Sequence, residues 1–311
     1  MTFTEYFRGW IDTYKAEAVR PVTLDKYRLT HSHLERLSGG ITMENLDRQA
    51  YQGIINGYAR DHAHLSVRNF HSHLKAAILD AVDEGLLSHN VARRVVFKGI
   101  SPVKKPKEKY LSCEESSRLL AVLDLERPII TDDRVNWDWL IMLCLKTGLR
   151  FSEALGLTGA DFDLKNRLLN VNKTYDYKHS FQIVTATKTE SSVRKISIDG
   201  HLTEHFSRIL CDVKDSNPIF VPDGQRVYDT IVNRRLAALC QNAQITPVSL
   251  HCMRHTHAAI LFYAGVNIVS ISKRLGHSNV TVTQDIYLHI IRELEQRENA
   301  LITESLESLG R

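Results

Sequence analysis

The chain contains 311 residues, of which 43% are hydrophobic and 24% charged, and its formal net charge at pH 7 is +4. This length exceeds the usual size of a single hydrophobic core, so the sequence predicts two domains. The sequence has no apolar run of the roughly 18 residues that a membrane span needs and no signal-peptide pattern at its N-terminus, which argues against a membrane or exported protein. Five scattered cysteines indicate reduced thiols, so we expect a cytoplasmic protein.

Basic charge is concentrated in a short segment near the middle of the chain. Residues 1–98 hold 13 Lys and Arg against 11 Asp and Glu, and residues 110–311 hold 23 against 24. The intervening residues 99–109 contain two prolines and have a net charge of +3. Such a connector can grip a polyanion such as the DNA backbone, or it can be an ordinary solvated linker. Four lysines are the candidate backbone contacts: Lys104, Lys105, Lys107 and Lys109.

Residues 1–98 predict a four-helix domain without a visible catalytic cluster. Helical spacing places four aromatic side chains on one inward-facing stripe of a helix over residues 3–16: Phe3, Phe7, Trp10 and Tyr14. Three further helices are expected, one opened by Pro21 with Thr23 as its N-cap and ended by Gly39-Gly40, one over 47–60 and one over 66–86. Six histidines in this domain form pairs two positions apart, which do not share a helix face. We interpret these pairs as surface residues and not as metal ligands: His31 and His33, His62 and His64, His71 and His73.

The second part of the chain predicts a mainly helical domain that contains a small sheet. Ser112-x-x-Glu115 has the capping-box form and should start a helix. Residues 136–147 are almost wholly apolar, which indicates a central buried helix ended by Gly148. Three β-branched, alternating segments predict a three-stranded antiparallel sheet at about 168–174, 181–188 and 193–198. Further helices are expected near Arg150 and over about 201–213, 227–243, 249–264, 267–275 and from 280 onward.

A possible reaction centre lies between residues 246 and 289, which contain a His-x-x-Arg pair, a Gly-His pair and a tyrosine. These side chains suit attack on a phosphodiester, because planar guanidinium forks hold the two non-bridging oxygens well. Arg254 supplies one fork, and Arg150 is the best candidate for the second. Glu153, three residues after Arg150, is expected on the same helix face, where it could orient this guanidinium or a neighbouring imidazole. An ordinary surface Arg–Glu pair is the alternative.

Tyr287 is the candidate nucleophile, since a phenol can carry the phosphoryl group and leave again. Either His251 or His277 could accept its proton or hydrogen-bond the phosphate. The acid for the leaving 5′ oxygen would be Lys188 at the tip of the predicted hairpin, with two competitors on the return strand, Arg194 and Lys195.

A zinc site of the protease type is the main competing chemistry. His251 and His255 are four positions apart on a helix, but Cys252 stands where the catalytic Glu would follow, and no third ligand is evident. The sequence also contains neither a Walker-type loop nor a dinucleotide fingerprint.

The ordered segments TGLRFSEALGL, TKT, SLHCMRHTHA, LGH and TQDIYLH resemble the catalytic domain of the tyrosine recombinase (phage integrase) family over about residues 105–295. Residues 1–98 are similar, less specifically, to the helical core-binding domain of that family, with 99–109 as a basic linker and 110–311 as the catalytic domain. The resemblance is closest to integrases of phages and conjugative elements of Gram-positive bacteria.

The resemblance implies a mainly α fold and a role for each matching position. It assigns the first catalytic Arg to Arg150, its acidic companion to Glu153, the hairpin Lys to Lys188, the His-x-x-Arg box to His251 and Arg254, the second His to His277 and the nucleophile to Tyr287. It implies site-specific cleavage and rejoining of DNA through a 3′-phosphotyrosine, with no metal or nucleotide cofactor. The implied partners are double-stranded DNA attachment sites, a homotetramer in the synaptic complex and accessory DNA-bending or excision factors.

Two alternatives to a recombinase stay open at this stage. A type IB topoisomerase-like enzyme would use the same groups to nick and relax DNA, and a silent DNA-binding regulator would keep the fold alone. After Tyr287, an apolar stripe in an acidic segment could dock on a neighbouring protomer or pack as an ordinary terminal helix: Ile290, Ile291, Leu294, Leu301, Ile302, Leu306 and Leu309.

Overall fold

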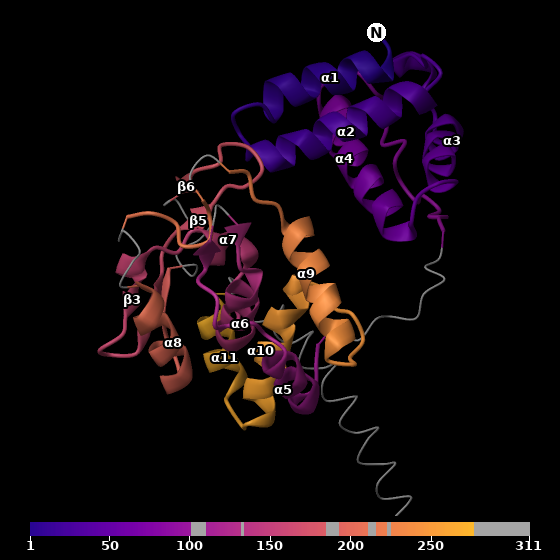
Figure 1. Cartoon of the computed structure of the whole chain (residues 1–311). Helices are drawn as coiled ribbons and strands as arrows, with labels where there is room; N and C mark the ends of the chain where they lie inside the picture. Colours follow the sequence, from indigo (N-terminus) through magenta and orange to yellow (C-terminus); the bar gives the residue numbers. More distant parts are fainter. Residues whose placement is uncertain (101–109, 132–133, 185–192, 211–215, 223–224, 277–311) are drawn as a thin grey trace, which may run out of the picture. The chain divides into compact units, whose positions relative to one another are not determined.

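The chain divides into two compact units, residues 1–105 and 106–311, each of which is described by itself. The structure is a computed structural model that describes residues 1–100, 110–131, 134–184, 193–210, 216–222 and 225–276 (Figure 1). No helix within these residues is long and apolar enough to cross a membrane.

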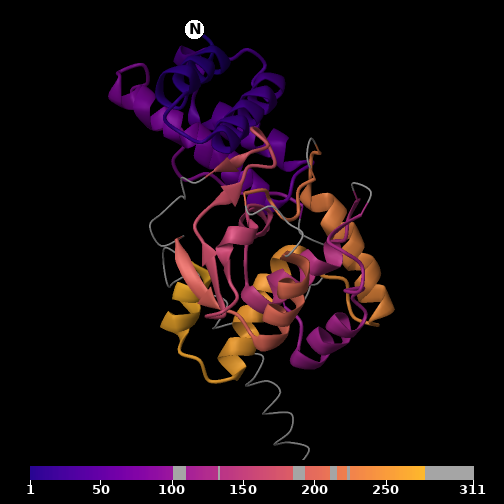
Figure 2. The same ribbon diagram turned by 60° about the vertical axis from the view of Figure 1, so that its left-hand side comes forward.

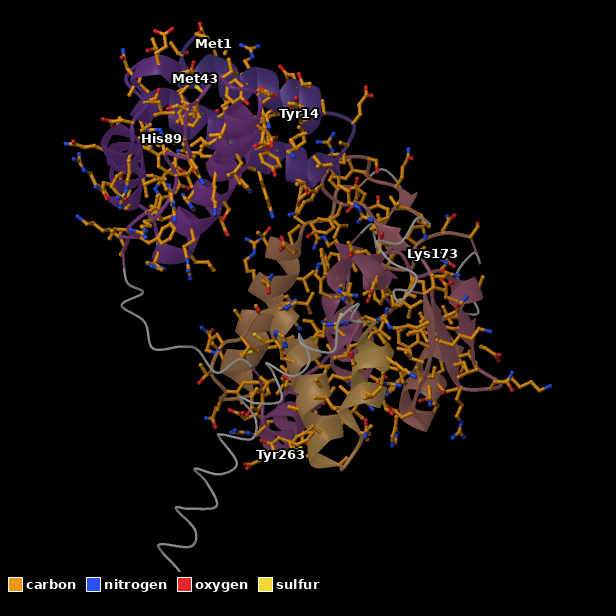
Figure 3. All side chains as sticks on the ribbon, turned by 180° about the vertical axis from the view of Figure 1, so that it is seen from behind. Met1, Tyr14, Met43, His89, Lys173 and Tyr263 are labelled. Atoms are coloured by element: carbon orange, nitrogen blue, oxygen red, sulfur yellow. The ribbon has the colours of Figure 1, made fainter. Side chains whose placement is uncertain are left out.

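The first unit is built from four α-helices, as predicted: α1 (Phe3–Tyr14), α2 (Pro21–Leu37), α3 (Arg48–Ala59) and α4 (His64–Asp83). A capping box between Thr2 and Glu5 starts α1, and the predicted aromatic stripe fills the core from that helix. Tyr14 is the exception: the residue is 47% exposed, and its hydroxyl donates a 2.7 Å hydrogen bond to Glu84 Oε1 (Figure 3).

Two sequence predictions about this unit are wrong. Thr23 does not cap α2, because the helix begins two residues earlier with Pro21 after the N-cap residue Arg20. Proline fits the first helical position since its missing N–H would have no partner there. His71 is buried and not on the surface, and the Tyr51 hydroxyl lies 3.0 Å from its Nδ1. Burial, together with the charge of Lys75, lowers the pKa of His71 to about 4.

The second unit contains seven α-helices in its described residues. They are α5 (Cys113–Ala121), α6 (Trp137–Thr147), α7 (Phe151–Leu155), α8 (Gly200–Leu210), α9 (Asp229–Asn242), α10 (Leu250–Tyr263) and α11 (Ile268–Leu275). The Ser112–Glu115 capping box is present at the start of α5. As expected, α6 is almost wholly buried and packs against α9 and α10.

The sheet prediction is only partly correct. The described three-stranded antiparallel sheet has the order β3 (Phe162–Asp163), β4 (Leu168–Val171), β7 (Arg194–Ser197). The segment at 183–184 forms β6 (Ile183–Val184), which pairs with β5 (Thr174–Tyr175) in a separate sheet. A second two-stranded sheet joins β1 (Ile130–Thr131) to β2 (Arg134–Val135). Alternating side chains indicate a strand but do not specify its partner, which explains the error.

Contacts of the residues that flank the strands fix the three-stranded sheet within the unit. Lys173, labelled in Figure 3, forms an ion pair with the buried Asp161, whose carboxylate also accepts a 2.8 Å hydrogen bond from the Thr158 N–H. At the edge formed by β7, α11 lies beside the strand, and the Arg274 Nη2 donates a 2.9 Å hydrogen bond to the Ser197 carbonyl (Figure 2). The sheet is therefore joined to the helix that ends just before His277.

Gly148 ends α6 in the left-handed conformation, with φ +70°. A Cβ atom built there would lie 2.6 Å from Leu275 Cδ2 and 2.8 Å from His257 Cδ2. Glycine is thus needed both for the backbone turn and for the close approach of α10 and α11 to the end of α6.

Gly148→Ala should destabilise the protein more than the same change at Gly265, where φ is +81° and a Cβ would have no atom within 4 Å. Left-handed backbone costs either alanine about 1–2 kcal/mol. Overpacking at Gly148 should add about 1–3 kcal/mol. Urea unfolding of both variants measures the difference, and equal losses of stability would contradict the packing argument.

Candidate active site

Arg150 and Glu153 form the predicted pair at the start of α7. Arg150 is the N-cap residue, and its backbone N–H donates to Glu153 Oε2 at 2.8 Å while its Nη1 donates to Oε1 at 2.8 Å. Glu153 is only 3% exposed, so the alternative of an ordinary surface pair is wrong. A buried carboxylate needs full charge compensation, so Glu153 requires a further cationic partner beside the partly exposed Arg150.

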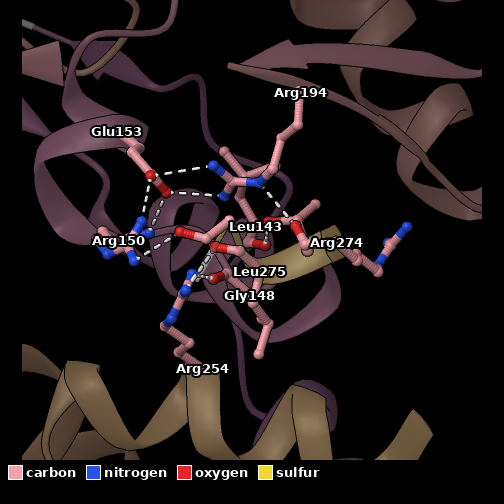
Figure 4. Close-up of polar contacts among 10 residues, drawn as sticks. Leu143, Gly148, Arg150, Glu153, Arg194, Arg254, Arg274 and Leu275 are labelled. Carbon is pink, nitrogen blue, oxygen red and sulfur yellow. Dashed lines mark hydrogen bonds and ion pairs between the residues drawn. The ribbon is translucent and has the colours of Figure 1, made fainter. Parts of the chain in front are cut away.

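Arg194 is the second partner of Glu153 (Figure 4). Arg194 lies on β7. Its Nη1 donates a 3.1 Å hydrogen bond to Glu153 Oε1, and its Nη2 donates a 2.9 Å hydrogen bond to Oε2. Burial alone would raise the pKa of Glu153, but the hydrogen bonds and charge of Arg194, with the charge and backbone N–H of Arg150, lower it to about 2. Glu153 is therefore an anion held between two guanidinium groups at neutral pH.

Arg254, the second predicted fork, projects from α10 and is 3% exposed. Its Nη1 donates to the Gly148 carbonyl at 2.7 Å, and its Nη2 donates to the Leu275 carbonyl at 2.5 Å. Burial and the nearby charge of Arg150 lower its pKa to about 9, so the guanidinium is still protonated at neutral pH. One side chain thereby links the ends of α6 and α11.

Three successive carbonyls at the C-terminal end of α11 each accept a hydrogen bond from a different arginine. Arg194 Nε donates to the Arg274 carbonyl at 2.6 Å, Arg254 binds the Leu275 carbonyl, and Arg150 Nη2 donates to the Gly276 carbonyl at 3.1 Å. The last carbonyls of a helix lack partners within the helix and carry its negative dipole end, so cations are stabilised there. The structure therefore brings Arg150, Glu153 and Arg254 together at the residue that precedes His277 (Figure 4).

His251 lies on the exposed side of α10, three residues before Arg254. Partial burial and the positive charges of Arg254 and Arg150 lower the pKa of its imidazole below the ordinary value. Its ring packs edge-on against His255, with 4.8 Å between the ring centroids. The imidazole is thus mainly neutral at pH 7 and able to accept a proton.

The two competitors for the acid role lie on opposite faces of β7. Arg194 points inward, and its donors are engaged with Glu153 and the Arg274 carbonyl. Lys195, the next residue along the strand, has an exposed side chain on the other face. Neither placement suits delivery of a proton to a phosphate held at Arg150 and Arg254.

Sequence reasoning missed a supporting contact on α10. His257 is buried, with Nδ1 3.0 Å from the Leu145 carbonyl and Nε2 accepting a 2.9 Å hydrogen bond from Arg274 Nε. Burial and the charge of Arg274 lower the pKa of His257 to about 3, so the ring is neutral and donates through Nδ1. Its position in the His-x-His run was visible in the sequence, but its partners were not.

Three predicted catalytic residues lie outside the described residues: Lys188, His277 and Tyr287. The same holds for the linker lysines Lys104, Lys105, Lys107 and Lys109 and for the C-terminal apolar stripe. Within the described residues, no group of three His, Cys, Asp or Glu side chains is arranged to hold a metal ion.

Comparison with known proteins decides which family this site belongs to. The sequence profile of the Phage integrase family matches residues 109–293, more than half of the chain. The chain belongs to the phage integrase family. The predicted family and enzyme class, tyrosine recombinase, are thereby confirmed. One phage integrase relative, the integrase of Staphylococcus phage L54a, is 25% identical over 97% of this chain and 94% of its own length.

Two solved integrase structures share the fold. The integrase of transposon Tn1549, in complex with transposon right end DNA, matches with a TM-score of 0.75 and 22% identity over 96% of this chain and 99% of that one. A lambda integrase tetramer bound to a Holliday junction matches with a TM-score of 0.67 and 16% identity over 90% of this chain and 79% of that one. These likenesses confirm the predicted mainly α fold class.

Proposed function

We propose that the chain is a site-specific DNA recombinase that integrates or excises a mobile element through a 3′-phosphotyrosine intermediate. One observation carries the proposal at this site: two guanidinium forks, from α7 and α10, converge on consecutive carbonyls directly before His277. Arginines that share so small a space repel one another, and a phosphate between them would relieve that repulsion.

In the proposed cleavage step, Arg150 and Arg254 bind the two non-bridging oxygens of the scissile phosphate. The Tyr287 phenol attacks phosphorus, a new P–O bond forms, and the bond to the 5′ oxygen breaks. The lowered pKa of His251 favours its neutral imidazole, which has a free nitrogen to accept the phenol proton, and His277 would hydrogen-bond the phosphate. Lys188 would donate a proton to the leaving 5′ oxygen. Glu153 would support the site by holding Arg150.

Rejoining reverses these steps with the 5′ hydroxyl of a second strand as the attacking group. The energy of the broken phosphodiester is kept in the phosphotyrosine, so the reaction needs no nucleotide. Positive charge from arginine takes the place that a metal ion fills in other phosphoryl-transfer sites, and no metal is required in this proposal.

Both parts of the chain would bind the DNA. Residues 1–98 would be a core-binding domain, residues 99–109 a linker whose lysines contact the phosphate backbone, and residues 110–311 the catalytic domain. The tetramer seen for lambda integrase on a Holliday junction supports a homotetramer on paired sites. Accessory DNA-bending or excision factors are proposed as further partners, and action on bacterial DNA would locate the protein in the cytoplasm, associated with the nucleoid.

A nicked duplex that spans one end of the mobile element tests the proposal. Cleavage near the nick releases a short fragment that cannot return, so the covalent protein–DNA adduct should accumulate, and EDTA should not reduce its yield. DNA binding without any adduct would contradict the proposal and favour a silent regulator. Relaxation of supercoiled DNA without recombination of paired sites would instead favour a topoisomerase.

A further inference from the structure

Arg194 makes a set of contacts to which the proposed chemistry gives no role. The side chain is 7% exposed, although it belongs to a strand at the edge of the described three-stranded sheet. Strand alternation explains its direction: Arg194 and Ile196 face inward, and Lys195 faces out. Arg194 pairs with Val171 of the neighbouring strand β4. This pairing holds the backbone from which the Arg194 side chain extends.

The three nitrogens of this guanidinium connect two parts of the candidate site. Nη1 and Nη2 form a two-point contact with the Glu153 carboxylate, and Nε donates to the Arg274 carbonyl. A planar fork with donors on two edges can make both contacts at once, which the single ammonium group of lysine cannot do. Glu153 in turn holds the backbone and guanidinium of Arg150.

We infer that Arg194 is a positioning residue, which holds Glu153 against Arg150 and ties the end of α11 to β7 so that both phosphate-binding arginines are aligned. This inference rests on the proposed function, since it assigns Arg194 a part in the same reaction. It also replaces the alternative that Arg194 is the acid, because its donors are directed at a carboxylate and a carbonyl.

Loss of Arg194 would affect both phosphate-binding arginines. Glu153 would keep Arg150 as its partner but would lose the contact that fixes its own position. The Arg274 carbonyl would lose its donor, and the adjacent carbonyls that bind Arg254 and Arg150 belong to the same turn. A displacement of about 1 Å at a reacting centre can lower the rate about 100-fold. DNA affinity should be kept, because it is spread over many contacts outside this site.

The first test is single-turnover cleavage of the nicked duplex at saturating protein. Arg194→Gln should lower the rate constant about 100-fold without weakening DNA binding. Arg194→Lys keeps the charge and should restore only part of the rate. Arg208→Gln is the matched control, because Arg208 forms an exposed ion pair with Glu204 on α8 of the same unit, and it should cleave at the wild-type rate.

The second test separates positioning from proton donation. In a duplex with sulfur in place of the bridging 5′ oxygen, the P–S bond breaks and the thiolate leaves without needing a proton. The sulfur substrate should restore cleavage by Lys188→Ala, the variant of the proposed acid, and should leave the defect of Arg194→Gln unchanged. Restoration of Arg194→Gln by sulfur would overturn the inference and make Arg194 the acid.

The third test asks whether Arg194 acts through Glu153. The double variant Arg194→Gln/Glu153→Gln should cleave no more slowly than the slower single variant, because both changes break the same connection. The inference would be overturned if the rate defects of the two single variants multiplied in the double variant, or if Arg194→Gln cleaved at the wild-type rate. If Arg194→Gln does not fold, the same cleavage rates are measured for Arg194→Lys, and the same outcomes support or overturn the inference. Failure of the proposed function is distinguishable, since the wild-type protein would then form no adduct at all.

Discussion

Arg254→Lys is expected to lower the rate of strand cleavage about 100- to 1,000-fold, the loss typical of removing one preorganised donor from a charged transition state. Lysine keeps the positive charge, but it cannot donate to the Gly148 and Leu275 carbonyls and to a phosphate oxygen together. The phosphate would then lose a guanidinium group that is held in position by the carbonyls at the ends of α6 and α11.

Single-turnover cleavage of the nicked duplex measures this loss, with DNA affinity measured on the same duplex. Arg208→Lys, the same change at an exposed arginine of the same unit, should have no effect on the rate. A rate for Arg254→Lys equal to that of the wild-type protein would show that Arg254 is a structural link between helices and not a phosphate ligand.

Glu153→Ala is expected to destabilise the second unit by about 3–5 kcal/mol, since it leaves the buried guanidinium of Arg194 and the partly exposed one of Arg150 without their anion. Both Arg150 and Arg194 bind this carboxylate within 3.1 Å. Glu204→Ala is the matched control: it removes the anion of an exposed Arg–Glu pair and should cost less than about 1 kcal/mol. Urea unfolding gives both values, and equal small losses would mean that Glu153 is not an essential counter-ion.

The same carboxylate predicts a pH dependence of stability. The pKa of Glu153 falls from 4.5 to about 2 on folding, so its stabilisation is fully present above pH 4.5 and is lost as the pH falls toward 2. Between these values, the free energy of unfolding should fall more steeply for the wild-type protein than for Glu153→Ala. Parallel curves for the two proteins would contradict the lowered pKa.

Local signals in the sequence predicted most of the helices. The apolar run that forms α6 is ended by Gly148, and the Ser112–Glu115 box starts α5, because both signals act within one helical turn. The Arg150–Glu153 contact is equally local, with its partners three residues apart. Such features depend on neighbours in the chain and need no knowledge of the tertiary fold.

Contacts between distant residues were not predictable in the same way. Arg194 and Glu153 are 41 positions apart, and no local sequence pattern in either segment indicates that the two side chains are in contact. The strand pattern around 183–184 gave the strand but not its partner, and the burial of His71 depends on how α4 packs against α3. The hydrogen bonds from the three arginines to the carbonyls at the end of α11 are therefore visible only in the tertiary structure.

The measurement that tests the central claim most directly is identification of the residue and the DNA end in the covalent adduct. The adduct formed on the nicked duplex would be digested with protease, and the peptide that remains on the DNA would be sequenced by mass spectrometry. We predict a peptide joined through Tyr287 to a 3′ phosphate, a free 5′ hydroxyl on the released strand, and no adduct from Tyr287→Phe. Attachment through another residue, attachment to a 5′ phosphate, or an unchanged adduct from Tyr287→Phe would contradict the account.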